Sequence, residues 1–242
     1  MSVLDGAVVL VTGANGGLGQ HWVAQALHRG AARVYATDLR PGSWEDSRVV
    51  PVALDVTDEA SVAALADRAQ DVTLLINNAG IPQREPFLDV AEEALHRTFD
   101  VNFFGPLRMA RHFAPALIRN GNGRIVNVIS LLSWMAIAPG YSSTKAALWS
   151  MTNSLRLELE PRGVRVVAVH MGFTDTPMTL GLDVPKNDPA DVVRAAFDVI
   201  ESNGEEVLVD DWTRAVKAAL AGPIRAMYPQ LDGADLPFGQ GQ

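Results

Sequence analysis

Short apolar segments alternate with longer segments of helical periodicity along the whole chain, and this alternation limits the folds open to it. Segments that are apolar on both faces are typical of a parallel sheet covered by helices, and right-handed crossovers between such strands give a doubly wound α/β fold. We therefore predict a doubly wound parallel sheet of about seven strands, flanked by helices. The expected strands are Ala7–Thr12, Val34–Thr37, Val49–Leu54, Thr73–Asn77, Arg124–Ile129, Val164–His170 and Glu206–Val209. The expected helices are Leu18–Arg29, Glu59–Ala69, Glu92–Arg119, Ser142–Glu160, Ala190–Ser202 and Asp211–Ala221.

The length of 242 residues suits one large domain, and no stretch resembles a flexible linker. We predict a single domain over residues 1–221, followed by an irregular tail over 222–242 that is rich in Pro and Gly. The early apolar run Ala7–Val11 is too short to span a membrane and lacks a preceding basic segment. We therefore expect neither an anchor nor a signal peptide.

Composition excludes several classes of site. A net charge of −8 without a basic cluster argues against a nucleic-acid partner, because phosphate binding needs concentrated Lys and Arg. The chain has no cysteine, which rules out disulfides, thiolate nucleophiles and Cys-ligated metals. We expect a cytoplasmic protein that binds a small molecule and has no membrane partner.

A glycine-rich segment directly follows the first expected strand and opens the first expected helix. Glycines there let the backbone turn sharply and approach a diphosphate, while the helix N-terminus offers free N–H groups and a partial positive charge. The alternative is a glycine-rich loop that binds nothing, but the flanking strand and helix favour a cofactor phosphate. The residues expected around this phosphate are Gly13, Asn15, Gly17, Leu18 and Gly19.

Acidic residues follow the second and third expected strands. Asp38 stands 19 residues after Gly19, where a carboxylate accepts hydrogen bonds from a ribose diol and repels a 2′-phosphate, so NAD is expected rather than NADP. Arg40 is a rival signal, because its guanidinium could pair with a 2′-phosphate. Asp55, with Val56 beside it, either faces an adenine edge or caps a turn, and the sequence leaves both alternatives open.

Tyr141 and Lys145 lie four residues apart in a helical segment and therefore share one face of it. A phenol with a pKa of about 10 is a poor acid–base group at neutral pH, but an adjacent ammonium and a nicotinamide cation stabilise the phenolate and lower that pKa. Alone, this pair is a weak pattern. It gains weight from further residues expected where the loops of the sheet gather, namely Asn77, Asn78, Ala79, Gly80, Asn102 and Ser130.

With these residues the chain resembles the short-chain dehydrogenase/reductase family, in the form built from a single Rossmann-type domain. The resemblance covers residues 8–178 and rests on the motifs Thr12-Gly13-x-x-x-Gly17-x-Gly19, Asn77-Asn78-Ala79-Gly80, Asn102, Ser130 and Tyr141-x-x-x-Lys145. It implies that Tyr141 is the general acid–base and that Lys145 binds the nicotinamide ribose and lowers the tyrosine pKa. It also implies that Ser130 orients the substrate oxygen, that Asn102 holds a water in a proton relay, and that residues 78–80 contact the cofactor.

The family also has a Pro-Gly-x-x-x-Thr stretch after the sixth strand, where the backbone and the threonine bind the nicotinamide amide. Here it reads Met171-Gly172-Phe173-Thr174-Asp175-Thr176, so methionine stands in the proline position. The resemblance makes Gly172, Thr174 and Thr176 expected cofactor contacts.

The loops around the expected site bear on the substrate. Ser130 precedes Tyr141 by 11 positions, fewer than is usual in similar sequences, so we expect a shortened loop. Ser133 is a rival for orienting the substrate, but Ser130 directly follows a strand and is favoured. Apolar residues in these loops predict an open pocket for a fairly bulky, apolar ketone or secondary alcohol, unless half of them are ordinary core. The expected substrate contacts are Ser130, Leu132, Trp134, Tyr141 and Phe173.

Two further features concern metals and assembly. His170 ends a strand near the cleft, but no second ligand stands at metal-ligand spacing, so we expect a buried imidazole and no metal. The helical segment Ser142–Glu160 carries a second stripe with Trp149 and Thr152, more apolar surface than one sheet contact needs. A homodimer or homotetramer is expected, as the resemblance also implies.

Together these features predict an NAD(H)-dependent oxidoreductase, a short-chain alcohol dehydrogenase or carbonyl reductase, that interconverts a secondary alcohol and a ketone with Tyr141 as general acid–base. A non-catalytic NAD-binding sensor or scaffold of the same fold is the main alternative, but it would need none of the four residues Tyr141, Lys145, Ser130 and Asn102. A lyase-like relative is a third interpretation. It would be expected to lose the glycine turn or Lys145, and both are present.

Overall fold

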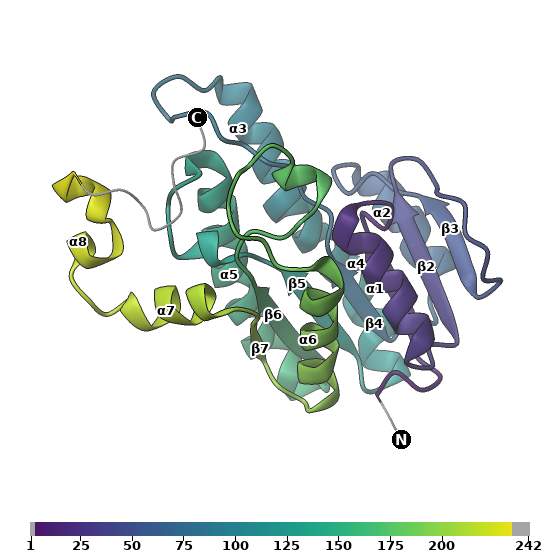
Figure 1. The fold of residues 1–242 in the computed structure, drawn as a ribbon. Coiled ribbons are helices and arrows are strands. Elements are labelled where there is room, and N and C mark those ends of the chain that lie inside the picture. The colour runs from purple at the N-terminus through teal and green to yellow at the C-terminus, as the bar shows by residue number, and fades with distance from the viewer. Residues whose placement is uncertain (1–2, 234–242) are drawn as a thin grey trace.

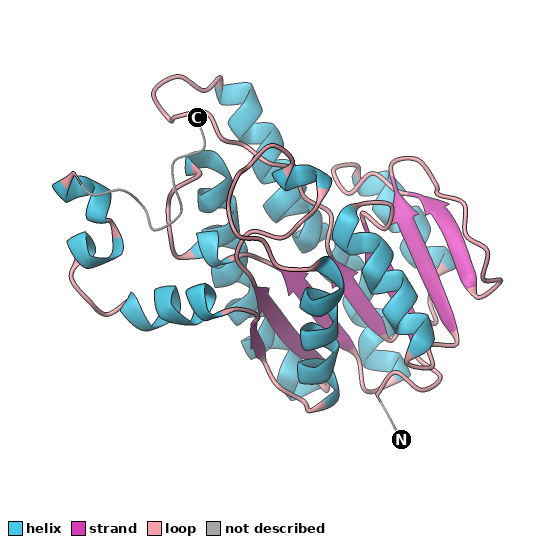
Figure 2. Cartoon of the chain, viewed as in Figure 1, coloured by secondary structure: helices cyan, strands magenta, loops and turns pink. Residues whose placement is uncertain are grey.

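Seven parallel strands form one sheet in the order β3-β2-β1-β4-β5-β6-β7 in the computed structural model, which describes residues 3–233 (Figure 1). Helices cover both faces of this sheet, as Figure 2 shows. The predicted single-domain, doubly wound α/β fold is thereby confirmed. The strands are β1 (Val8–Thr12), β2 (Arg33–Asp38), β3 (Val49–Ala53), β4 (Leu74–Asn77), β5 (Arg124–Val128), β6 (Arg165–His170) and β7 (Glu206–Leu208).

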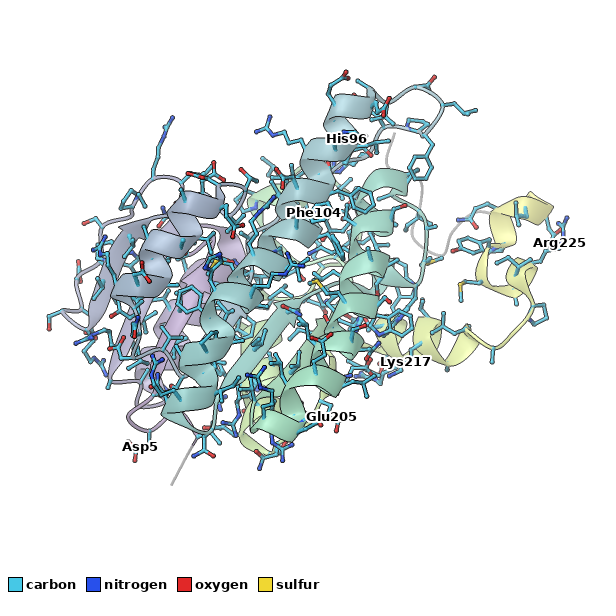
Figure 3. All side chains as sticks on the ribbon, turned by 180° about the vertical axis from the view of Figure 1, so that it is seen from behind. Asp5, His96, Phe104, Glu205, Lys217 and Arg225 are labelled. Carbon is cyan, nitrogen blue, oxygen red and sulfur yellow. The ribbon has the colours of Figure 1, made fainter. Side chains whose placement is uncertain are left out.

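The helices form two layers. On one face of the sheet, α1 (Gly17–His28) and α6 (Pro189–Glu201) pack together. The other face is covered by α2 (Glu59–Arg68), α4 (Gly105–Asn120) and α5 (Pro139–Leu159), and Figure 3 looks onto this side. Each layer buries its own apolar core against strands that are apolar on both faces, which is the pattern that the sequence predicts.

Large aromatic side chains hold the two helices of the first layer together. Trp22 of α1 and Phe197 of α6 are fully buried, and their rings meet edge to face with centroids 5.0 Å apart. Such a pair contributes roughly 0.5–1.5 kcal/mol beyond the burial of its area. The contact fixes the two helices against each other on the side of the sheet where the glycine-rich turn begins.

Successive strands are added on one side of β1 up to β3, and from β4 onward they are added on its other side. Because β1 pairs with both β2 and β4, Val9 lies beside Val34 on one side and beside Leu74 on the other. The loops that follow β1 and β4 therefore diverge at the carboxyl edge, and ligands of doubly wound sheets bind in the crevice that forms there.

The single helix predicted over Glu92–Arg119 is instead three segments. A π-helical turn, Asp100–Phe104, separates α3 (Glu92–Phe99) from α4. This turn spaces its hydrogen bonds five residues apart, so the helix continues but changes phase. Apolar periodicity alone does not reveal the change, although Gly105 and Pro106 directly after the turn are poor helix formers.

Beyond β7, the chain forms α7 (Asp211–Ala219), the short α8 (Ile224–Met227) and a 3₁₀ turn over Pro229–Asp232. An irregular tail is predicted from residue 222, so its first part is more ordered than expected. The Ala136 N–H donates a hydrogen bond of 3.0 Å to the Tyr228 hydroxyl, which ties this segment to the loop after β5. Residues 234–242 of the predicted tail lie outside the described residues.

The second stripe predicted on α5 is largely used within the chain. Thr152 is fully buried and accepts a hydrogen bond of 2.9 Å from the Asn127 amide. The Trp149 ring packs edge to face on Trp134, with centroids 5.9 Å apart. These two residues therefore support the fold of one chain, and the expected homodimer or homotetramer stays a prediction.

Candidate active site

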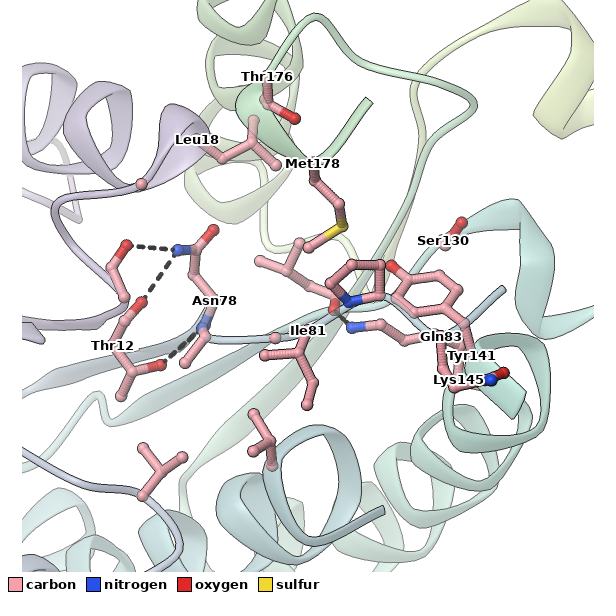
Figure 4. Close-up of a pocket in the computed structure, with 18 of the residues that line it drawn as sticks. Thr12, Leu18, Asn78, Ile81, Gln83, Ser130, Tyr141, Lys145, Thr176 and Met178 are labelled. Carbon is pink, nitrogen blue, oxygen red and sulfur yellow. Dashed lines mark hydrogen bonds between the residues drawn. The ribbon is translucent and has the colours of Figure 1, made fainter. Parts of the chain in front are cut away.

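A cavity of about 1110 Å³ lies at the carboxyl ends of the strands, and part of its lining is drawn in Figure 4. Ligand pockets in proteins commonly have about 300–1,000 Å³, so this one has room for a dinucleotide together with a small substrate. Every loop from β1 to β6 contributes to its lining. One residue from each of these loops, in chain order, is Gly13, Leu39, Asp55, Asn78, Ser130 and Gly172.

The turn after β1 needs its glycines for close approach. Gly13 has a φ of +64°, in the left-handed region, and a Cβ on it would lie 3.0 Å from the Ala79 backbone. A Cβ on Gly19 would lie 2.1 Å from the carbonyl oxygen of Gly13. The N-terminus of α1 carries no side-chain cap, and Gly17 and Leu18 there line the cavity, so the helix presents its N–H groups to whatever binds.

Asn78 joins the loops after β1 and β4. Its side-chain amide donates to the carbonyl oxygens of Thr12 at 2.9 Å and of Gly13 at 3.1 Å, drawn as dashed lines in Figure 4. The Thr12 hydroxyl in turn accepts from the backbone N–H groups of Asn78 and Ala79, both at 3.0 Å. These bonds fix the floor of the crevice where the two halves of the sheet diverge.

Acidic groups stand at the end of the cavity formed by β2 and β3. The Asp38 carboxylate accepts backbone hydrogen bonds from Asn15 at 3.1 Å and from Leu39 at 2.9 Å. Asp55 Oδ1 accepts from both the backbone and the hydroxyl of Thr57, at 2.9 and 2.6 Å. Asp55 thus caps a turn, one of the two roles that the sequence leaves open, while it and Val56 also line the cavity.

Tyr141 and Lys145 lie on the first turns of α5, which begins at Pro139, three residues earlier than predicted. Both side chains line the cavity, and the Lys145 ammonium lies 5.4 Å from the centroid of the Tyr141 ring. Lys145 is buried, and its Nζ donates a 2.8 Å hydrogen bond to the carbonyl oxygen of Val128 on β5. The helix therefore carries the pair, and the strand end orients the ammonium.

Burial shifts the pKa of both groups toward their neutral forms. It lowers the pKa of the Lys145 ammonium to about 8 and raises the pKa of the Tyr141 phenol above its usual value. The sequence predicts a lowered tyrosine pKa when a nicotinamide cation is bound, and in the protein alone burial raises that pKa instead. The protonated phenol is the form that can give a proton to a carbonyl oxygen.

Asn102 lies in the π-helical turn and is fully buried. Its amide pairs with the Ile81 backbone as a neighbouring strand would, accepting from N–H at 2.9 Å and donating to C=O at 3.0 Å. The same amide donates to the Thr144 hydroxyl at 3.1 Å. Asn102 therefore joins the loop after β4 to the helix that carries Tyr141, and it stands behind the cavity wall rather than in its lining.

Ser130 follows β5 and lines the cavity, and Figure 4 shows it above Tyr141. Its hydroxyl accepts from the Leu132 N–H at 3.1 Å and donates to the carbonyl oxygen of Met171 at 3.4 Å. Ser133, the rival from the sequence, is buried and does not line the cavity. The geometry therefore favours Ser130 as the serine that can reach a bound substrate.

The loop after β6 is anchored from below by Asp210, the residue before α7. This carboxylate accepts hydrogen bonds from the backbone of Gly172 at 2.7 Å, the Asn187 amide at 2.8 Å and the backbone of Thr213 at 2.8 Å. Burial would raise the pKa of Asp210, but these hydrogen bonds outweigh burial and hold that pKa below its usual value. The Phe173 ring next to Gly172 packs on Trp212, with centroids 5.7 Å apart.

Most of the predicted site residues line this one cavity, and four do not. Asn15 is a support for Asp38, and its side chain donates to the carbonyl oxygen of Arg40. Gly19 packs inside the turn, and Asn102 stands behind the wall. Trp134, an expected substrate contact, is buried and stacks on His170, because the loop after β5 folds its apolar side chains under α7.

The sequence did not single out Gln83 and Arg84, whereas Met178 is one of the apolar loop residues expected around the site. Gln83 and Arg84 from the loop after β4 line the cavity, as does Met178 from the loop after β6. The Arg84 guanidinium donates to the carbonyl oxygen of Met178, so a hydrogen bond joins the two loops there. For Gln83 and Arg84, the sequence signal is their position shortly after Asn77-Asn78-Ala79-Gly80.

Residues 3–233 also bear on metal binding and on membrane insertion. Across this part of the chain, no three His, Asp or Glu side chains are grouped so as to hold a metal ion. Within the same range, no helix combines the length and the apolar character needed to cross a bilayer.

Comparison with known proteins places the chain among similar sequences and folds. A sequence model described as short chain dehydrogenase matches residues 7–185. The L-xylulose reductase of Homo sapiens is 41% identical over 184 residues, which are 72% of this chain and 75% of that protein. A short chain dehydrogenase from Burkholderia cenocepacia, solved in complex with NADP, aligns with a TM-score of 0.88 and 39% identity over 96% of this chain and 99% of that one. A 3-ketoacyl-(acyl-carrier-protein) reductase from Brucella melitensis, complexed with NADH, aligns with a TM-score of 0.75 and 27% identity, covering 84% and 93% of the two chains.

Proposed function

The chain belongs to the short-chain dehydrogenase family of oxidoreductases, and from this premise we propose that it interconverts a secondary alcohol and a ketone by hydride transfer, with Tyr141 as general acid–base. The observation that carries the proposal is the convergence of Tyr141, Lys145 and Ser130 on one cavity that the glycine-rich turn also lines.

The residues present fit a nicotinamide dinucleotide. The uncapped N-terminus of α1 faces the cavity, and the Gly13 turn leaves no room for a side chain beside Ala79. These features suit a diphosphate, which needs free N–H groups and close backbone approach. Asp38 would hold the adenosine ribose, and Gly172, Thr174 and Thr176 would lie near the nicotinamide.

When bound, the nicotinamide ring supplies or accepts the hydride. The protein's own residues manage the proton: Tyr141 Oη gives it to the carbonyl oxygen in reduction and takes it from the hydroxyl in oxidation. Lys145 holds the ribose and favours the phenolate electrostatically, and Ser130 donates a hydrogen bond that orients the substrate oxygen. Asn102 supports a proton path behind Tyr141 through its position between Ile81 and α5.

We propose NAD rather than NADP as the cofactor, and a fairly bulky, apolar substrate. Asp38 lines the cavity, and a carboxylate there repels a 2′-phosphate. The short chain dehydrogenase from Burkholderia cenocepacia was solved with NADP, so the choice between NAD and NADP is the first property to measure. The substrate end of the cavity is lined by apolar side chains, which suit an apolar ketone or alcohol. They include Ile81, Leu132, Met171, Phe173, Met178 and Leu182.

The test follows nicotinamide absorbance with NAD and NADP separately, across secondary alcohols and ketones that range from small polyols to bulky apolar compounds. We expect Tyr141→Phe to lose about 10²–10⁴-fold in kcat while it still binds the dinucleotide. Tyr35→Phe is the matched control, since it removes a phenol hydroxyl that bonds Asp71 and does not line the cavity. Full activity of Tyr141→Phe would refute the mechanism, and dinucleotide binding without turnover on any substrate would support the sensor alternative.

A further inference from the structure

His170 is a fully buried imidazole at the end of β6 for which the proposed mechanism has no role. Its ring stacks on Trp134, with centroids 4.0 Å apart and planes inclined by 14°. Its Nδ1 lies 3.1 Å from the carbonyl oxygen of Ser130 and 3.3 Å from the hydroxyl of Ser133. The imidazole is thus held directly under the serine that faces the substrate.

The carbonyl oxygen of Ser130 is the centre of an unusual number of hydrogen bonds. It accepts from the Ser133 N–H at 3.2 Å and from the Ser133 hydroxyl at 2.8 Å, in addition to His170. A carbonyl oxygen has two lone pairs, so three donors crowd a single acceptor. They hold the peptide plane that follows Ser130, and the direction of the Ser130 side chain depends on that plane.

The hydrogen-bond partners assign the proton of the imidazole to Nδ1, because the Ser130 carbonyl oxygen can only accept. The second nitrogen, Nε2, is buried without a hydrogen-bond partner. It lies 3.6 Å from a carboxylate oxygen of Glu206, whose other oxygen is paired with Lys217. Leaving Nε2 as a buried acceptor without a hydrogen-bond partner costs free energy of folding. The ring keeps this orientation, in which Nδ1–H points to the Ser130 carbonyl oxygen.

We propose that His170 is a positioning residue that holds the Ser130 hydroxyl toward the substrate through the Ser130 carbonyl. The inference rests on the proposed function of Ser130. It adds that a residue at the end of β6 supports this serine, which follows β5. Trp134 contributes by stacking on the imidazole, which fixes the plane of the ring and so the direction of its Nδ1–H.

Two substitutions separate the hydrogen bond from the packing. His170→Phe keeps an aromatic ring against Trp134 but removes the donor, whereas His170→Asn keeps a donor near the position of Nδ1 but removes the stack. We expect His170→Phe to lower kcat by about 3- to 10-fold, the loss typical of one hydrogen bond, with the KM for the dinucleotide unchanged. His170→Asn should retain most of the activity, although it loses more packing.

A double-mutant cycle with Ser130→Ala tests the route of the effect. If His170 acts through the Ser130 hydroxyl, His170→Phe costs nothing further in kcat once that hydroxyl is gone. Equal losses of kcat in the two backgrounds would show a general structural role and would overturn the proposal.

A second readout does not depend on turnover. With labelled protein, the carbonyl ¹³C shift of Ser130 should change in His170→Phe and return toward the wild-type value in His170→Asn. An unchanged shift in His170→Phe would show that the imidazole does not hold this carbonyl, whether or not any alcohol is oxidised. If no substrate turns over but the shift changes as expected, the proposed reaction fails while the support of Ser130 stands.

Discussion

Lowering the pH should reduce the free energy of unfolding of this protein through the protonation of His170. Burial lowers the pKa of His170 from 6.5 to about 4, with Lys217 among the smaller causes, and the bond to the Ser130 carbonyl opposes them. The unfolded chain therefore binds a proton at higher pH than the folded one. Stability from this group is complete above about pH 6.5, is lost as the pH falls toward 4, and then levels off.

The size of the effect follows from the shift. A difference of about 2.5 pKa units at about 1.4 kcal/mol each gives about 3 kcal/mol, a large part of the stability of a typical domain. Urea unfolding followed by circular dichroism at pH 7.5 and pH 4.5 measures it, with His170→Phe as the matched variant because carboxylates also titrate in this range. The wild type should lose about 2–3 kcal/mol more than the variant between these pH values. Equal losses would refute the assignment of His170 as a buried neutral imidazole.

Three other outcomes follow from the site. Gly19→Ala places a methyl carbon 2.1 Å from a backbone carbonyl, so it should lower the free energy of unfolding by roughly 1–3 kcal/mol and weaken dinucleotide binding, as thermal unfolding and a fluorescence titration would show. The kcat/KM for NADH should fall as the pH rises through about 8, because the buried Lys145 then loses its proton; a flat profile would contradict this. Asp210→Asn should raise the KM for the dinucleotide several-fold by loosening Gly172, while Asp188→Asn, which alters the cap of α6, should not.

The sequence predicted the sheet, the crossovers and the main chemistry because each depends on local patterns. Apolar runs on both faces indicate buried parallel strands, and four-residue spacing places Tyr141 and Lys145 on one helical face wherever the helix begins. The glycine turn is equally local, since its function depends on the flanking strand and helix. These features need no knowledge of how distant segments meet.

The remaining parts of the site depend on contacts that sequence periodicity does not contain. Trp134 belongs to an apolar loop in either interpretation, and only the packing of α7 decides that it is buried beneath the site. Asp210 has the pattern of a helix cap, which it is, but its bond to Gly172 spans 38 residues. The lowered tyrosine pKa is expected with a nicotinamide cation bound and stays a prediction, because in the protein alone burial raises the pKa of Tyr141.

Because of the π-helical turn Asp100–Phe104, the number of residues between α3 and α4 matters to the site, apart from which residues they are. Deleting one residue there would allow an unbroken α-helix with almost the same composition, in which α3 and α4 keep their faces but the wide turn that carries Asn102 is lost. The amide of Asn102 could then no longer pair with Ile81 while α4 kept its apolar stripe on the sheet. A gene that lost one codon here would still encode a well-formed helix, and the link from the loop after β4 to the helix of Tyr141 would be gone.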